Sequence, residues 1–367
     1  MTTIAPDVSA SQKEQLIELV GGVDTHQDTH TAAAVDTAGR LLGHRQFPAT
    51  AAGYRQLLAW LRGFGAVLVV GVEGTGVYGA GLARYLRDQD VVMVEVDRPD
   101  RKARRFTGKS DPLDAQAAAR AALGGIRTGV PKERDGQVEA LRNLRVARRS
   151  AVAQRADCQR RIKSLLVTAP ELLRAVLRGL STTALIGTCA ALRPDSSRID
   201  DPEQAAKTAL RHLARRHQGL TAEIEDLDAV IGPLVVQINP DLLALNGVGA
   251  DVAGQLLVTA GQNTDRLRSE AAFAMLCGVA PIPASSGKTH RHRLNRGGDR
   301  QANAAIYRVV LCRMRWDLRT RAYVERRTAQ GLSKKDIIRC LKRLIARELY
   351  YVLTAPTTTA TQPARAA

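Results

Sequence analysis

Residues 19–47 read LVGGVDTHQDTHTAAAVDTAGRLLGHRQF, and this stretch decides the fold of the N-terminal part of the chain. Three runs favour extended backbone, namely Leu19 to Asp24, Thr31 to Val35 and Leu41 to Phe47. Residues 37–39, Thr-Ala-Gly, supply a turn between the second run and the third. Short extended runs separated by turn residues are typical of neighbouring antiparallel strands. The stretch therefore predicts a three-stranded meander.

Helical and extended segments alternate after the meander. Apolar residues at helical spacing cover Ala51 to Arg62 and Val77 to Arg87, whereas extended apolar runs cover Ala66 to Val72 and Val91 to Val96. A further helix is expected from Asp111. This alternation predicts an α/β sheet with helices packed on it. The element order is similar to that of the ribonuclease-H-like fold, in which the first and fourth strands are adjacent and central.

The composition predicts a polyanionic partner. The chain of 367 residues has 54 Lys and Arg against 36 Asp and Glu, a formal charge of +18, which suits nucleic acid or an anionic membrane. The longest apolar run, near Ala66 to Val72, is far shorter than the roughly 20 residues that span a bilayer. The first 15 residues lack the pattern of a secretory signal. We therefore expect a cytoplasmic, nucleoid-associated protein that binds nucleic acid and no membrane.

The region from about Pro131 to Asn239 has no strand signals and is predicted to form long helices. Apolar residues there recur in steps of three and four, with His217 as the polar member: Leu210, Leu213, His217, Leu220, Ile224, Leu227, Ile231 and Leu234. This heptad pattern is typical of a coiled coil. Either an antiparallel helical hairpin within one chain or an intermolecular coiled coil explains it, and roughly three heptads do not distinguish them.

Two apolar helical stretches flank Gly247 and Gly249 in the sequence DLLALNGVGADVAGQLLVTAG. The pattern is typical of a helix-hairpin-helix, whose glycine turn presents backbone N–H groups to a DNA phosphate. A tight turn that binds nothing is the alternative. The end of the chain, residues 354–367, is of low complexity and predicted to be disordered.

Four carboxylates form the candidate catalytic and metal-binding set: Asp24, Glu73, Asp111 and Asp114. The first two are expected on the adjacent central strands. The last two open a helix, where Pro112 suits the first turn, Asp111 is a candidate cap, and the i, i+3 spacing puts both aspartates on one face. Four converging carboxylates require divalent cations, and oxygen ligands suit Mg²⁺ or Mn²⁺. Each residue alone also has an ordinary structural explanation.

Basic residues lie upstream of Asp111 and are candidates for holding a phosphate backbone, although a solvated surface is the simpler explanation: Arg101, Arg104, Arg105 and Lys109. The segment PIPASSG at residues 281–287 is followed by further cations, namely Lys288, Arg291, Arg293, Arg296 and Arg300. A serine on such a turn is a candidate nucleophile for a DNA phosphate, with the cations stabilising the transition state. A solvated loop is again the alternative.

As an ordered set, these motifs resemble the DEDD transposases of the insertion-sequence 110/116/902 group. The resemblance covers nearly the whole chain and is carried by five segments: VGVDTHQDTH, GVEGTGVYG, KSDPLDAQAAAR, LLALNGVGADVAGQLL and CGVAPIPASSGKTHRHRLNRGGDRQAN. It implies an α/β RuvC-like domain at residues 1–130 and a helical, oligomerising linker at 131–238. It further implies a mostly α-helical transposase domain with a helix-hairpin-helix at 239–353, before the tail at 354–367.

The resemblance also implies a function. Asp24, Glu73, Asp111 and Asp114 would bind the metal, and Ser286, with Ser285 as its rival, would join covalently to DNA. A structured bridge RNA would guide excision and insertion by pairing with the element ends and the target, and dimers would assemble into a tetramer. A RuvC-like junction nuclease that uses the tetrad without serine chemistry is the alternative function, and a non-catalytic nucleic-acid-binding protein is a third hypothesis.

Overall fold

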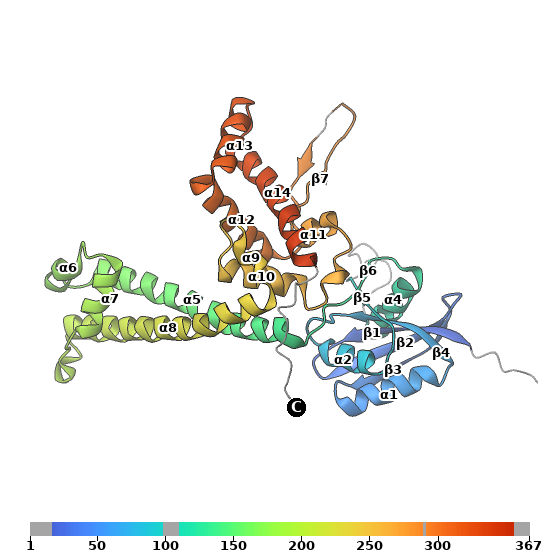
Figure 1. Cartoon of the computed structure of the whole chain (residues 1–367). Coiled ribbons are helices and arrows are strands. Elements are labelled where there is room, and N and C mark those ends of the chain that lie inside the picture. The colour runs from blue at the N-terminus through green and yellow to red at the C-terminus, as the bar shows by residue number, and fades with distance from the viewer. Residues whose placement is uncertain (1–16, 98–109, 289–290, 356–367) are drawn as a thin grey trace, which may run out of the picture. The chain divides into compact units, whose positions relative to one another are not determined.

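The computed structural model describes residues 17–97, 110–288 and 291–355. The chain divides into two compact units, with the boundary between Arg134 and Asp135. The first unit is a mixed α/β sheet domain and the second is mostly helical, as Figure 1 shows. The predicted combination of an α/β N-terminal domain and a mainly helical remainder is therefore confirmed.

The first unit is built on one six-stranded sheet. Its strands are β1 (Glu18–Thr25), β2 (Thr29–Asp36), β3 (Leu41–Pro48), β4 (Ala66–Glu73), β5 (Met93–Val96) and β6 (Thr128–Gly129), in the spatial order β3-β2-β1-β4-β5-β6. Strand β2 is antiparallel to β1 and β3, which confirms the meander, while β4 is parallel to both β1 and β5. The two-residue strand β6, antiparallel to β5, was not predicted because it is too short to show alternation.

Helices cover both faces of this sheet. Helix α1 (Ala51–Arg62) packs Leu57, Leu58 and Leu61 on the face that also contacts α2 (Ala80–Asp88). Helix α4 (Asp111–Gly124) covers the opposite face. Helix α2 begins three residues later than predicted, because the carbonyl of Gly74 accepts from the N–H groups of Val77 and Gly79 in a turn.

A long antiparallel helical hairpin begins the second unit. Helix α5 (Gly136–Thr168) and helix α8 (Pro202–Ile238) lie side by side (Figure 1), joined at the far end by α6 (Glu171–Leu177), α7 (Thr182–Ala191) and the 3-10 turn Ser196–Arg198. The predicted heptad stripe lies on α8, and its polar member His217 contacts Gln159 of α5 at 2.8 Å. The sequence left open an intramolecular hairpin and an intermolecular coiled coil. In the structure the stripe is covered by α5, a helix of the same chain.

The remaining helices share one hydrophobic core, which includes Phe273. They are α9 (Asp241–Ala244), α10 (Ala250–Ala260), the 3-10 turn Thr264–Arg266, α11 (Glu270–Leu276), α12 (Arg300–Trp316), α13 (Leu318–Ala329) and α14 (Lys334–Thr354), with the short strands β7 (Ile282–Pro283) and β8 (His292–Arg293) between α11 and α12. Among the described residues, no helix combines the length and apolar character that crossing a membrane requires.

One carboxylate ties three helices of this unit together. Asp251, at the start of α10, accepts from Arg145 of α5 at 2.9 Å and from Arg308 of α12 at 2.5 Å. Burial alone would raise the pKa of Asp251, but the two guanidinium groups outweigh it and hold the pKa below its ordinary value. The ionised carboxylate is therefore the form that stabilises the fold, and its contribution is present at neutral pH and lost as pH falls through this depressed pKa.

We expect Asp251→Asn to destabilise the second unit by about 3 kcal/mol, because Arg145 would keep a largely buried charge without its carboxylate. Urea unfolding at pH 7, followed by Trp316 fluorescence in a Trp60→Phe background, measures the change. Asp226→Asn, an exposed position on α8, is the control and should change stability by no more than about 0.5 kcal/mol. Equal midpoints for the two variants would contradict the role given to Asp251.

Candidate active site

Two glycines let helix α4 approach the sheet so closely that the helix backbone contacts the strand backbone. A Cβ atom on Gly22 of β1 would lie 2.1 Å from the backbone nitrogen of Ala119 and 2.2 Å from the carbonyl oxygen of Ala115. One on Gly71 of β4 would lie 2.7 Å from the carbonyl oxygen of Ala118. Backbone atoms cannot yield to such contacts as flexible side chains can. Only glycine at these two positions allows α4 to hold its first turn against the ends of β1 and β4.

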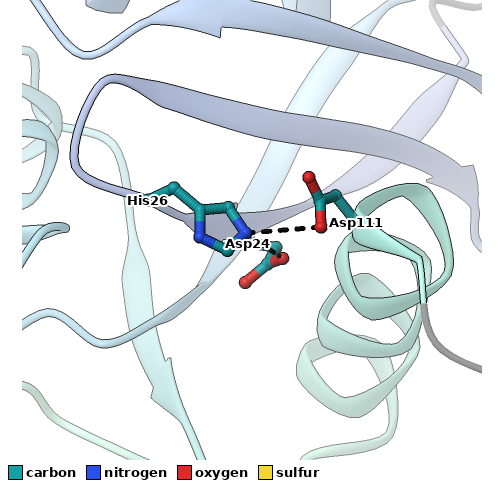
Figure 2. A group of neighbouring side chains, drawn as sticks. All are labelled: Asp24, His26 and Asp111. Carbon is teal, nitrogen blue, oxygen red and sulfur yellow. Dashed lines mark ion pairs between the residues drawn. The ribbon is translucent and has the colours of Figure 1, made fainter.

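Asp24, His26 and Asp111 converge at this place, as Figure 2 shows. The Nε2 atom of His26 lies 3.2 Å from a carboxylate oxygen of Asp24 and 3.3 Å from one of Asp111. One ligand atom from each residue falls within 4.8 Å of the other two. The side chain of Asp24 is 11% exposed and that of Asp111 is 41% exposed, so the group is open on the helix side.

Asp114 and Glu73 complete the predicted tetrad in different ways. Asp114 is buried. The burial of Asp24 itself raises the pKa of Asp24, and so do the charges of Asp114 and Asp111, whereas His26 lowers it. Glu73 ends β4 one position beyond the pair Val23 and Val72, which makes it the strand neighbour of Asp24. Side chains alternate along a strand, so Glu73 lies on the same face as Gly71, the face toward α4. The structure thus brings Asp24 and Asp111 together around His26, with Asp114 close enough to raise the pKa of Asp24, and places Glu73 by strand register.

The N-cap of α4 is not Asp111, the residue that the sequence offered as a candidate cap. The cap position is Ser110, whose side chain makes no capping bond, and Asp111 is already the first helical residue. The suggestion that Asp111 caps the helix is therefore wrong. Both aspartates lie in the first turn, where the helix dipole favours negative charge.

His26 was not predicted as a member of the site. It follows Asp24 by two residues, just beyond the end of β1 at Thr25. A strand's period of two places such residues on the same side of the backbone, so the spacing Asp-x-His was the available signal. This spacing alone does not identify a site residue, because a histidine in a turn is common without any function.

The candidate serines lie on a hairpin of the second unit, described at residues 279–288 and 291–297 and here termed the serine hairpin (Figure 1). Strands β7 and β8 pair at its stem, and Ala284 donates from its backbone N–H to the carbonyl of Arg291 at 2.9 Å. Ser285 and Ser286 are exposed, and Gly287 follows at a φ of 54°, a conformation that favours glycine. The predicted cations around them are exposed as well: Lys288, Arg291, Arg293, Arg296 and Arg300.

The other predicted nucleic-acid contacts have different outcomes. Arg101, Arg104, Arg105 and Lys109 lie outside the described residues. Gly247 has a φ of 79°, and Gly249 occupies the N-cap position of α10. The helix before this turn, α9, is a single turn rather than a full helical stretch.

Comparison with known proteins matches both parts of the chain to transposase families. Residues 21–169 match the DEDD model of IS110, described as a transposase, and residues 240–325 match the model described as the transposase IS116/IS110/IS902 family. The first match contains all four carboxylates of the tetrad and the second contains both serines. The chain belongs to the IS110 family of transposases.

Two proteins of insertion elements are similar to this family member over part of their length. The uncharacterized 43.6 kDa protein of insertion element IS110 from Streptomyces coelicolor is 32% identical over 163 residues, which is 44% of this chain and 38% of that protein. The uncharacterized 42 kDa protein of insertion element IS900 from Mycobacterium paratuberculosis is 27% identical over 154 residues, 41% of this chain and 39% of that protein. The chain therefore matches about two fifths of the length of these relatives.

We expect Gly22→Ala to destabilise the first unit by about 3 kcal/mol, the upper end for an overpacked site, because its methyl group would meet the backbone of α4. Urea unfolding followed by Trp60 fluorescence in a Trp316→Phe background reports on this unit. Gly124→Ala, at the end of α4, is the matched control, since its Cβ would make only ordinary contacts at 3.5 Å. Equal unfolding midpoints for the two variants would mean that α4 does not depend on Gly22.

A second prediction concerns Asp24 and divalent cations. Because the pKa of Asp24 is raised, its ionised form is less stable in the folded protein than in the unfolded chain, and this cost is present at neutral pH. Asp24→Asn should therefore raise the melting temperature in EDTA. A divalent metal at a concentration of one hundred times its Kd should increase the free energy of unfolding of the wild type by about 2.7 kcal/mol and that of the variant by almost nothing.

Differential scanning fluorimetry at pH 7, with and without Mn²⁺, separates these two effects. Asp88→Asn, an exposed position at the end of α2, should behave like the wild type in both conditions. If Mn²⁺ stabilises Asp24→Asn as much as the wild type, the metal binds elsewhere.

Proposed function

We propose that this IS110-family chain is a DNA transposase that excises and inserts an insertion sequence. In this proposal, metal-assisted strand cleavage forms a covalent phosphoserine–DNA intermediate, and a bridge RNA guides the choice of DNA. The convergence of Asp24, Asp111 and Asp114 where β1, β4 and α4 meet carries the proposal. Carboxylates brought together at partly buried positions need cationic partners, and a divalent cation bound to phosphate meets that need.

The first unit is proposed to be RuvC-like. The order β3-β2-β1-β4-β5, antiparallel on one side of β1 and parallel on the other, supports a ribonuclease-H-like arrangement. A division after residue 238 is supported by the end of α8 at Ile238. In this proposal residues 131–238, of which 131–134 lie in the first compact unit, form the linker with the helical hairpin, and residues 239–353 form the transposase domain with a helix-hairpin-helix around Gly247 and Gly249.

The residues that would hold Mg²⁺ or Mn²⁺ are Asp24, Asp111, Asp114 and Glu73, with His26 as a further donor beside the first two. When bound, the metal would activate the attacking oxygen or stabilise the leaving one. The helix dipole at the start of α4 lowers the electrostatic cost of holding two aspartates there. The small residues of α4 that rest on Gly22 and Gly71 give these carboxylates a rigid support.

Ser286 is the proposed nucleophile, with Ser285 as its rival. Its Oγ would form a bond to a DNA phosphorus as the bond from that phosphorus to a deoxyribose oxygen breaks. The serine would lose its proton and the departing DNA oxygen would gain one, and ligation would reverse both steps. The exposed cations Lys288 and Arg291 are suited to stabilise the phosphate in the transition state.

The proposed macromolecular partners are DNA, RNA and further copies of the chain. A net charge of +18 supports binding to DNA and RNA backbones by charge and shape, so that sequence choice would come from the base pairing of the RNA. Because the heptad stripe of α8 is used within the chain, dimers and a tetramer would need other surfaces of the hairpin. Apolar side chains near its far end are exposed and suit that role: Val167, Leu172 and Val176.

The test is to incubate the protein with Mg²⁺, labelled element-end DNA and RNA from the flanking region, and to resolve protein-linked DNA on a denaturing gel. We expect an adduct that Ser286→Ala and Asp24→Asn each reduce by at least 100-fold, because one removes the nucleophile and the other a metal ligand. Ser285→Ala is the matched control and should retain it.

Cleavage without any adduct, undiminished in Ser286→Ala, would instead identify a metal-dependent junction nuclease that uses the tetrad alone. An adduct that Ser285→Ala abolishes would move the nucleophile by one residue. DNA binding without cleavage in the wild type, unchanged in both variants, would contradict the transposase proposal.

A further inference from the structure

A pocket of about 540 Å³ lies at the base of the serine hairpin, within the second unit. This volume is inside the range of roughly 300 to 1,000 Å³ that is usual for small-ligand sites. Its walls come from both ends of the hairpin and from helices α13 and α14, and they include Arg293, Leu294, Tyr323, Cys340, Lys342 and Leu344.

The two ends of the hairpin are clamped beside this pocket. Gly278 and Gly298 both have positive φ, and a Cβ on Gly278 would lie 2.7 Å from the carbonyl oxygen of Gly297. The amide of Asn303 donates to the carbonyls of Cys277 and Gly278 at 3.1 and 2.9 Å. The chain at Gly278, which lines the pocket, is thus held by close backbone contacts and by the side-chain amide of Asn303, so this part of the wall is fixed by the fold.

Two cations of the pocket wall have carboxylate partners. Arg339 pairs with Asp336 at 2.8 Å, and Arg343 pairs with Glu270, also at 2.8 Å. Their charges are therefore largely neutralised, and neither supplies a net positive charge to a ligand.

Lys342 and Arg293 differ from these, because no carboxylate of the described residues lies within 4 Å of either charge. Lys342 donates to the Asn303 side chain at 2.7 Å and lies 6.0 Å from the Tyr307 ring, so it is held in place by neutral groups. Burial lowers the pKa of Lys342. A half-buried ammonium group without a counter-ion favours an anionic ligand.

We propose that this pocket receives one nucleotide of the DNA strand that the serine hairpin engages. Arg293 and Lys342 hold its phosphate, while its base lies against Tyr323, Leu294 and Leu344. A phosphate attached to a flat apolar group matches two unneutralised cations beside an aromatic and aliphatic wall. This inference rests on the proposed function, since DNA is preferred to RNA because the same hairpin carries Ser285 and Ser286.

Cys340 provides a direct readout, since it lines the pocket and is partly exposed. Cys312, also partly exposed but absent from the pocket wall, is an internal control in the same molecule. We expect saturating element-end DNA to slow the alkylation of Cys340 by iodoacetamide at least tenfold and that of Cys312 less than twofold. Mass spectrometry of the intact chain's peptides measures both rates.

Two variants test the recognition. Lys342→Gln should abolish the protection of Cys340, because it removes the uncompensated charge. Lys335→Gln, an exposed lysine on the same helix α14, should retain it. Moving a single abasic site along the DNA should restore rapid alkylation at one position only, which identifies the inserted base.

Other outcomes would overturn the proposal. DNA that saturates the protein in a mobility-shift assay but leaves the Cys340 rate unchanged would exclude the pocket while leaving the transposase proposal intact. Protection that no abasic position relieves would mean that the strand covers the pocket without inserting a base. Protection of Cys340 by RNA of the same sequence and not by DNA would show that the pocket receives RNA, which contradicts the proposal. A failure to bind element-end DNA at all would remove the proposed function itself.

Discussion

The close contact between helix α4 and strands β1 and β4 is the constraint on which the candidate metal site depends. At Gly22 and Gly71 the helix backbone approaches the strand backbone so closely that a single methyl group has no room. Four alanines of α4, at positions 115, 118, 119 and 122, form the opposing surface. A helix held at this distance brings the carboxylates of its first turn to the ends of the two central strands.

That geometry has an electrostatic cost. Asp24, Asp111 and Asp114 repel one another, and the burial of Asp24 adds to the penalty, as its raised pKa records. His26 offsets part of it by lying between two of the carboxylates. The positive end of the α4 dipole offsets a further part. The remaining imbalance is what makes a divalent cation a physically reasonable occupant, because it neutralises several carboxylates at once.

The second unit carries a large excess of arginine over acidic residues. Part of that charge is neutralised internally, most clearly where Asp251 ties α10 to α5 and α12. Arginines left exposed, as along the serine hairpin, are free to meet phosphate groups. The helical hairpin pairs its polar positions in register, with Arg148 against Asp228 and Gln159 against His217. Such specific polar pairs favour one alignment of the two long helices.

The sequence by itself determined the meander, the bounds of α1, the helical character of residues 136–168 and 202–238, and the family. These features depend on local periodicity or on short motifs, which are complete within a few residues of the chain. The tetrad was also selected from the sequence, as residue types at the ends of predicted elements. The catalytic roles of its members and of Ser286 remain predictions.

Only the tertiary structure decided which distant groups meet. It placed His26 between Asp24 and Asp111, gave the cap position to Ser110, added β6 and paired the heptad stripe of α8 with α5. It also formed the pocket at the base of the serine hairpin from separate segments between Gly278 and Leu344. Apart from the cap at Ser110, these features depend on contacts between parts of the chain that are remote in sequence, and a local pattern does not specify which remote segment it will meet.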